Sequence, residues 1–91
     1  MRVKVRFFAY FREIFDGREK DVVVPDGSTV GDLLDHLCDT EKRRAEVFKG
    51  SALKPLIIAM KNGTSIQSLD GFETKLEDDD VIAVFPFVGG G

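Results

Sequence analysis

The clearest helix of this chain is predicted by the stretch STVGDLLDHLC, residues 28–38. Its apolar side chains recur at the spacing of one helical face, which predicts an amphipathic helix packed on a core. They are Val30, Leu33, Leu34, Leu37 and Cys38. Thr29 and Asp32 are three residues apart, as in the capping box that begins many helices. Cys38 is therefore expected to point inward and His36 outward, which excludes a Cys–His catalytic pair here.

The sequence before this helix predicts two strands. Within residues 2–8, charged Arg2, Lys4 and Arg6 alternate with apolar residues, so Phe7 and the two valines are expected on the buried face. A second strand is predicted over 20–24. The short connection over 9–17, a turn or a short helix, makes the two strands antiparallel.

The sequence after the helix predicts a second, shorter helix over 41–49 and a strand over 56–60. Asn62-Gly63 comes after this strand and favours a type I′ turn, with residues 64–66 pairing back. A final strand is predicted over 81–85. This order of elements is that of an α+β domain of the β-grasp type, in which one main helix lies across a mixed sheet of four to five strands.

Length and composition fit one domain over residues 1–91, with a flexible tail over 88–91. The chain is 43% hydrophobic, which is enough for a single core, and its net charge of -3 argues against nucleic-acid binding. One cysteine cannot form an intrachain disulfide, and no apolar stretch is long enough to span a membrane. We therefore expect a soluble, cytoplasmic protein that does not contact nucleic acid or membrane.

The final strand is apolar on both of its faces, since residues 81–85 are Val-Ile-Ala-Val-Phe. One helix covers only one face of a sheet, so Phe85, with Phe87 beyond the strand, is expected in an exposed apolar patch. The alternative is that residues 41–54 fold over this patch. The acidic run Asp78–Asp80 precedes the strand, and its neutralisation is expected mainly to slow association with partners.

The last residues, Pro-Phe-Val-Gly-Gly-Gly over 86–91, place a carboxylate behind three glycines. Without Cβ atoms, such a tail can enter a narrow active site on another protein. The chain has no phosphate-binding loop of the GxxxxGK type, so it is not expected to activate this carboxylate itself. The tail is thus predicted to be a substrate, and the protein a carrier with no metal or cofactor rather than an enzyme. The alternative is a frayed end without function.

The whole chain resembles the β-grasp sulfur carriers, a family that includes MoaD, ThiS and the ubiquitin-like proteins. The likeness is greatest to MoaD, the small subunit of molybdopterin synthase. The stretches that carry it are residues 5–13, 28–34, 61–63 and 79–86. MoaD proteins commonly end in Pro-Pro-Val-x-Gly-Gly, and residues 86–91 match this pattern except for Phe87 in place of the second proline.

The resemblance implies that an E1-like adenylating enzyme activates the carboxylate of Gly91 and that a sulfur donor converts it to a thiocarboxylate. The sulfur would then pass to a pterin precursor on the large subunit of molybdopterin synthase, or to another acceptor protein. Gly89 and Gly90 would form the tail that carries it. The residues expected to bind partners are Phe85, Pro86, Phe87 and Val88.

Two alternatives remain open at this point. The chain is also similar to ubiquitin-like modifiers, including the small archaeal modifier proteins, whose terminal glycine joins target lysines or serves tRNA thiolation. It could instead be a β-grasp binding module without covalent chemistry. A binding module would work without Gly91, whereas a carrier or modifier would not.

Overall fold

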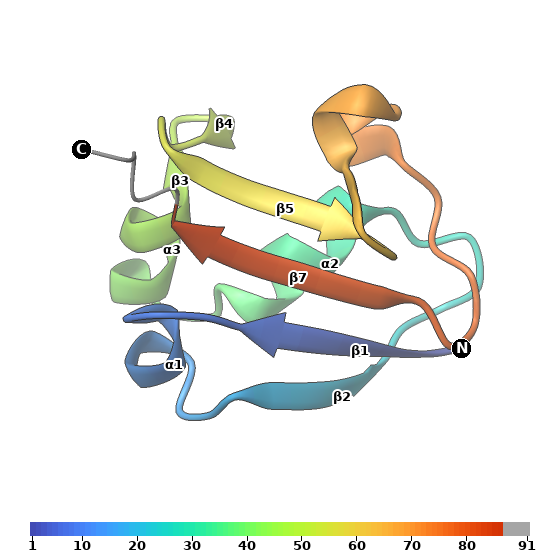
Figure 1. The fold of residues 1–91 in the computed structure, drawn as a ribbon, viewed down its shortest axis with the longest axis horizontal. Helices are drawn as coiled ribbons and strands as arrows, with labels where there is room; N and C mark the ends of the chain where they lie inside the picture. Colours follow the sequence, from blue (N-terminus) through green and yellow to red (C-terminus); the bar gives the residue numbers. More distant parts are fainter. Residues whose placement is uncertain (87–91) are drawn as a thin grey trace.

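A computed structural model describes residues 1–86 of the chain. Five strands form one mixed sheet in the order β2-β1-β7-β5-β6 (Figure 1). Their bounds are Arg2–Phe7 for β1, Glu19–Val23 for β2, Ile57–Lys61 for β5, Thr64–Ser65 for β6 and Val81–Pro86 for β7. The central pair β1 and β7 is parallel, and the other neighbours are antiparallel. This is the predicted β-grasp sheet.

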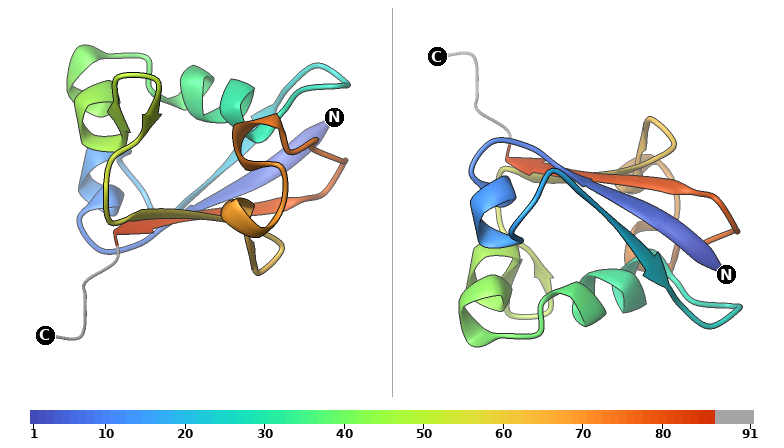
Figure 2. Two further views of the ribbon diagram at one scale, coloured as in Figure 1. Left: turned by 90° about the horizontal axis from the view of Figure 1, so that it is seen from above. Right: turned by 90° about the horizontal axis from the view of Figure 1, so that it is seen from below.

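Three α-helices, two 3₁₀-helices and a small hairpin make up the rest of the described elements. The α-helices are α1 (Phe11–Ile14), α2 (Val30–Leu37) and α3 (Glu41–Val47), and the 3₁₀-helices are η1 (Ile66–Ser68) and η2 (Gly71–Glu73). The hairpin pairs β3 (Phe48–Lys49) with β4 (Ala52–Leu53). All three α-helices lie on one side of the sheet (Figure 2).

Local sequence accounts for the main elements. The Thr29 side chain accepts a hydrogen bond from the Asp32 amide at 3.1 Å, and the Asp32 carboxylate accepts one from the Thr29 amide at 3.0 Å, which confirms the capping box. The β5–β6 turn has φ of 49° at Asn62 and 86° at Gly63, so both central residues take the left-handed conformation of a type I′ turn.

The core lies between the sheet and the α-helices. The inward face of β1 and the apolar stripe of α2 are buried there, as their periodicity predicts. Cys38 is 4% exposed and belongs to this core, whereas His36 is exposed. Within the described residues, no helix is long and apolar enough to cross a membrane.

The prediction of a helix over 41–49 was wrong at its C-terminal end. The helix α3 ends at Val47, and Phe48 is already extended and paired with Leu53. Gly50 takes a φ of 63° in the hairpin turn. Phe48 and Leu53 pack against the core, so burial of these side chains favours the hairpin over another helical turn.

Candidate functional site

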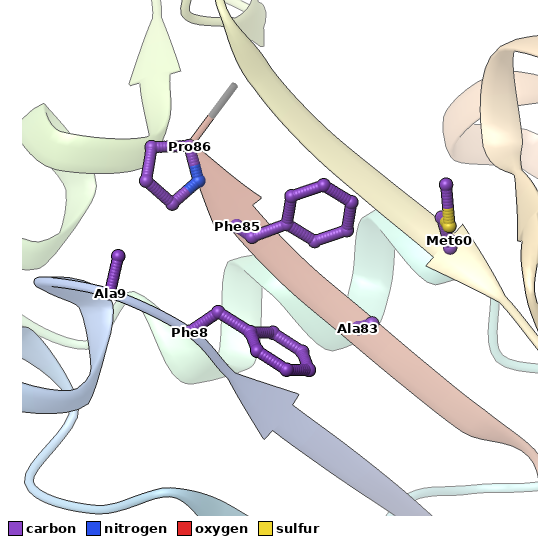
Figure 3. Close-up of a pocket in the computed structure, with 6 residues that line it drawn as sticks. All are labelled: Phe8, Ala9, Met60, Ala83, Phe85 and Pro86. Atoms are coloured by element: carbon purple, nitrogen blue, oxygen red, sulfur yellow. The ribbon is translucent and has the colours of Figure 1, made fainter. Parts of the chain in front are cut away.

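The side of the sheet that faces away from the helices carries an apolar hollow of about 430 Å³. Its lining residues are Phe8, Ala9, Met60, Ala83, Phe85 and Pro86. Figure 3 shows the rings of Phe8 and Phe85 on this face, with a helix behind the sheet. Pro86 is the last residue that the structure describes, so residues 87–91 continue directly from the rim of the hollow.

The alternation of β7 produces the floor of the hollow. Ile82 and Val84 point into the core and are 0% and 1% exposed, so Ala83 and Phe85 point to the opposite face. In the antiparallel pair β5–β7, Met60 lies opposite Ala83. Alternate side chains of β7 therefore pack in the core and line the hollow.

Phe8 closes the hollow on the β1 side. It comes after the last residue of β1, in the outward phase of that strand, and its ring meets the ring of Phe85 edge to face at a centroid distance of 5.8 Å. This is a favourable geometry for an aromatic pair. The two rings come from segments that are more than 70 residues apart in sequence, so only the parallel pairing of β1 and β7 brings them together.

The predicted site residues fall into two groups. Phe85 and Pro86 line the hollow, and the segment 41–54 lies on the other side of the sheet and does not cover it. Binding of partners by Phe85 and Pro86 stays a prediction. The remaining site residues lie outside the described part of the chain; they are Phe87, Val88, Gly89, Gly90 and Gly91.

Phe8 and Met60 line the hollow but were not among the site residues predicted from the sequence. Phe8 carried a signal, because it occupies the outward phase of the alternating segment 2–8 where a charged side chain would be usual. Met60 gave only a weak signal, since strand β5 is apolar in both phases. Without the strand register of the sheet, neither residue could be predicted to lie near Phe85.

Cys38 and His36 take no part in the hollow. Burial raises the pKa of the Cys38 thiol to about 11, so the thiol stays protonated at neutral pH and is a poor nucleophile. The described residues contain no group of three or more His, Cys, Asp or Glu side chains placed to hold a metal ion.

A polar cluster holds the opposite end of β7. The Asp80 carboxylate accepts hydrogen bonds from the Asn62 side-chain amide and from the Glu77 backbone N–H, both at 2.8 Å. Burial opposes ionisation of Asp80, but these hydrogen bonds and the nearby Lys61 ammonium outweigh it and lower the pKa of the carboxyl below its usual range. The carboxylate of Asp80 is thus part of the fold.

A β-grasp sheet with all its α-helices on one face and an apolar hollow on the other defines a small ubiquitin-like protein. A sequence model of the ThiS family matches residues 5–91, and the chain belongs to this family. The family confirms the resemblance to β-grasp sulfur carriers. It also places the chain among carrier and modifier proteins and not among catalytic enzymes.

Three similar proteins bear on function. The chain is 37% identical over 92 residues to small archaeal modifier protein 3 of Haloferax volcanii, and the match covers 100% of both chains. It is 27% identical to a Pyrococcus furiosus protein named as molybdopterin converting factor, subunit 1, with a TM-score of 0.75 and coverage of 97% and 99%. It is 26% identical to a chain of the Amycolatopsis orientalis BexX/CysO complex, with a TM-score of 0.79 and coverage of 98% and 99%.

Proposed function

We propose that this protein is a ubiquitin-like modifier and sulfur carrier that acts through the carboxylate of Gly91. The observation that carries the proposal is the position of the hollow: residues 87–91 continue directly from its rim at Pro86. Five residues extend at most about 17 Å. A partner seated on the hollow would therefore have the carboxylate within reach of its own active site.

The chemistry requires an activating enzyme. In an E1-like partner, an oxygen of the Gly91 carboxylate would attack the α-phosphorus of ATP, forming an acyl-adenylate and releasing pyrophosphate. A hydrosulfide ion from the sulfur donor would then displace AMP and leave a thiocarboxylate, or a lysine amine would displace AMP and leave an amide. Because adenylation consumes ATP, we place this protein in the cytoplasm. The rest of residues 1–91 would act as a single domain that presents the tail.

Of the two candidate functions, we favour the modifier over a role in molybdenum cofactor synthesis. It is supported by the relative of 37% identity, which is a small archaeal modifier protein matched over its full length. Its acceptors would be lysines on target proteins or an enzyme of tRNA thiolation.

Sulfur donation to a pterin precursor is the second candidate. It is supported by the similarity to the Pyrococcus furiosus protein and by the MoaD-like pattern of residues 86–91. The large subunit of molybdopterin synthase would then be the acceptor partner.

The test is incubation of the full chain with the E1-like enzyme of the same organism, ATP and a sulfur donor. Intact-mass measurement should show replacement of one oxygen by sulfur, and fragmentation should place the sulfur at Gly91. Deleting Gly90 and Gly91, or appending one residue after Gly91, should abolish the reaction. An unchanged mass with an enzyme that activates another carrier would refute the proposal.

A second experiment separates the two candidates. The activated protein is offered either to a cell extract with its lysine-bearing proteins or to the purified large synthase subunit with the pterin precursor. Isopeptide bonds between Gly91 and lysines support the modifier, and loss of sulfur to the pterin supports the synthase role.

A further inference from the structure

Two arginines flank Phe8 at the rim of the hollow. The guanidinium carbon of Arg6 lies 5.6 Å from the centroid of the Phe8 ring, and that of Arg12 lies 5.7 Å from it. Arg6 points outward from β1 and is exposed, whereas Arg12 comes from α1 and is half-buried. The Arg12 Nε donates a hydrogen bond to the Phe7 carbonyl at 3.1 Å, which fixes the side chain against the ring.

Neither guanidinium is neutralised within residues 1–86. The ion pairs of these residues include no carboxylate within 4.0 Å of Arg6 or Arg12. Glu19 lies opposite Arg6 in the β1–β2 register, but its carboxylate is paired with the Lys4 ammonium at 3.9 Å.

The arginines of α3 differ in this respect. Arg43 contacts Asp39 at 2.8 Å and Asp16 at 3.1 Å, and Arg44 is paired with Asp35. What sets Arg6 and Arg12 apart is their position: two guanidinium groups without an ion pair among residues 1–86 lie beside an apolar hollow, in a chain whose net charge is -3.

We infer that Arg6 and Arg12 form a carboxylate-binding rim that selects the activating enzyme. The inference rests on the proposed function. The enzyme surface would place an apolar side chain in the hollow and Asp or Glu carboxylates against the two guanidinium groups. A guanidinium stacked on an aromatic ring loses little further freedom on binding, and its planar donors match a carboxylate.

The hollow argues for a protein partner over a nucleic acid. Its lining is almost entirely apolar, with two aromatic rings, a methionine and a proline, and a sugar-phosphate backbone offers nothing to fill it. The negative net charge also disfavours a polyanion. An apolar centre ringed by charge is the usual anatomy of a protein interface.

Binding of the activating enzyme without ATP tests the rim separately from the chemistry. Arg6→Gln should weaken binding by about threefold at low salt, and the double variant with Arg12→Gln by about tenfold, as expected for exposed ion pairs. At about 0.5 M salt, the affinities of the variants should lie within about twofold of that of the unsubstituted protein, because screening removes the contribution of the charges.

Lys42→Gln is the matched control, since Lys42 is exposed on α3 and has no ion pair among residues 1–86. It removes the same charge on the other side of the sheet and should leave affinity unchanged. Arg6 makes no hydrogen bond through its side chain within the described residues, so Arg6→Gln remains informative even if Arg12→Gln disturbs the fold.

A carbodiimide cross-link identifies the chemical class of the partner group. In the Arg6→Lys variant, the new amine should form an amide with an Asp or Glu of the enzyme, mapped by mass spectrometry and absent from the unsubstituted protein. An amide to Gly91 of the same chain would mean that the protein's own carboxylate satisfies the rim, and would overturn the inference.

The outcomes separate the two proposals. If the unsubstituted protein is adenylated but the arginine variants bind as tightly as it does, the rim is refuted and the proposed function stands. If the unsubstituted protein is never adenylated by an active enzyme, the proposed function fails and the inference fails with it.

Discussion

Phe85 stands on the side of β7 that the core does not use. Its neighbours Ile82 and Val84 are buried, whereas Phe85 itself is half-buried and lines the hollow. Aromatic side chains at the centre of an interface commonly contribute about 2 kcal/mol or more to binding, because they fill a desolvated pocket. Partner binding through Phe85, as proposed, would therefore cost the fold little.

We predict that Phe85→Ala weakens binding of the activating enzyme by about 2 kcal/mol and lowers the free energy of unfolding by only about 1 kcal/mol. Val84→Ala on the same strand is the control, and it should lower stability more and leave affinity unchanged. Calorimetric titration and thermal unfolding measure the two effects. A large loss of stability with unchanged affinity would place Phe85 in the core.

Cys38 illustrates the opposite case, a reactive residue type in an inert position. We predict that Cys38→Ala keeps full transfer of sulfur to Gly91 and lowers the free energy of unfolding by about 1 to 2 kcal/mol, because a small buried side chain is removed. Activity and denaturant unfolding measure the two effects. A well-folded variant that no longer accepts sulfur would contradict this.

The thiol also predicts a change of stability at alkaline pH. Burial raises the pKa of Cys38 from 9.0 to about 11, so the unfolded chain loses the proton first. The stabilisation is complete below pH 9 and disappears as the pH rises through the folded-state value. The free energies of unfolding of the natural protein and of Cys38→Ala should therefore converge between these two pH values. Denaturant titrations at several pH values would show this.

At the scale of elements, the cluster around Asp80 ties the start of β7 to the β5–β6 turn. The Asn62 side chain bridges the two, since its amide donates to Asp80 at 2.8 Å and its oxygen accepts from the Val81 amide at 2.9 Å. Asp80 is only 6% exposed. The expectation that neutralising the whole acidic run mainly slows association is thus wrong for Asp80.

We predict that Asp80→Ala lowers the free energy of unfolding by about 2 kcal/mol, because the amides of Asn62 and Glu77 lose their acceptor. Asp79→Asn is the control: Asp79 is exposed, and asparagine tolerates its φ of 68°. It should leave stability unchanged and affect only association. Equal stability of the two variants would contradict the structural role.

The same carboxylate predicts an acid-sensitive fold. The pKa of Asp80 is lowered in the folded state, so its stabilisation is present above the unfolded value of 3.8 and is lost as the pH falls through the lower folded value. The free energy of unfolding of the natural protein should therefore fall more steeply with decreasing pH below about pH 4. Asp80→Ala should lack this contribution, which a comparison of the two acid titrations would show.

At the scale of the whole molecule, the two faces of the sheet have different tasks. The helices and the core residues lie on one face, and the core of the described part extends no further along the chain than Val84. The opposite face holds the hollow, the arginine rim and the point from which residues 87–91 continue. Under the proposed function, folding and partner binding would therefore use largely separate sets of side chains.

This separation predicts that the tail can be altered without loss of the fold. Deleting Gly90 and Gly91 should leave the unfolding midpoint within about 2 °C of its original value, because no buried contact of residues 1–86 is removed. The same deletion should abolish adenylation. A protein that unfolds at clearly lower temperature after the deletion would show that the tail stabilises the domain.

The elements that depend on local spacing were predictable from the amino-acid sequence alone. The stripe of α2, its Thr29–Asp32 cap and the Asn62-Gly63 turn are readable because their signals lie within a few residues of one another. The two-sided apolar pattern of the final strand likewise predicted an uncovered face. The glycines of the tail predict chemistry at the Gly91 carboxylate, and this stays a prediction because residues 87–91 lie outside the described part of the chain.

Which side chains meet depends on long-range strand pairing and could not be predicted from local spacing. Phe8 and Phe85 become neighbours because β1 and β7 run parallel, and the register of that pair is set by burial of the whole opposite face. The β3–β4 hairpin forms where Phe48 and Leu53 reach the core. The structural role of Asp80 depends in part on such pairing: its partner Glu77 is local, whereas its partner Asn62 lies on a turn that only long-range pairing brings to it.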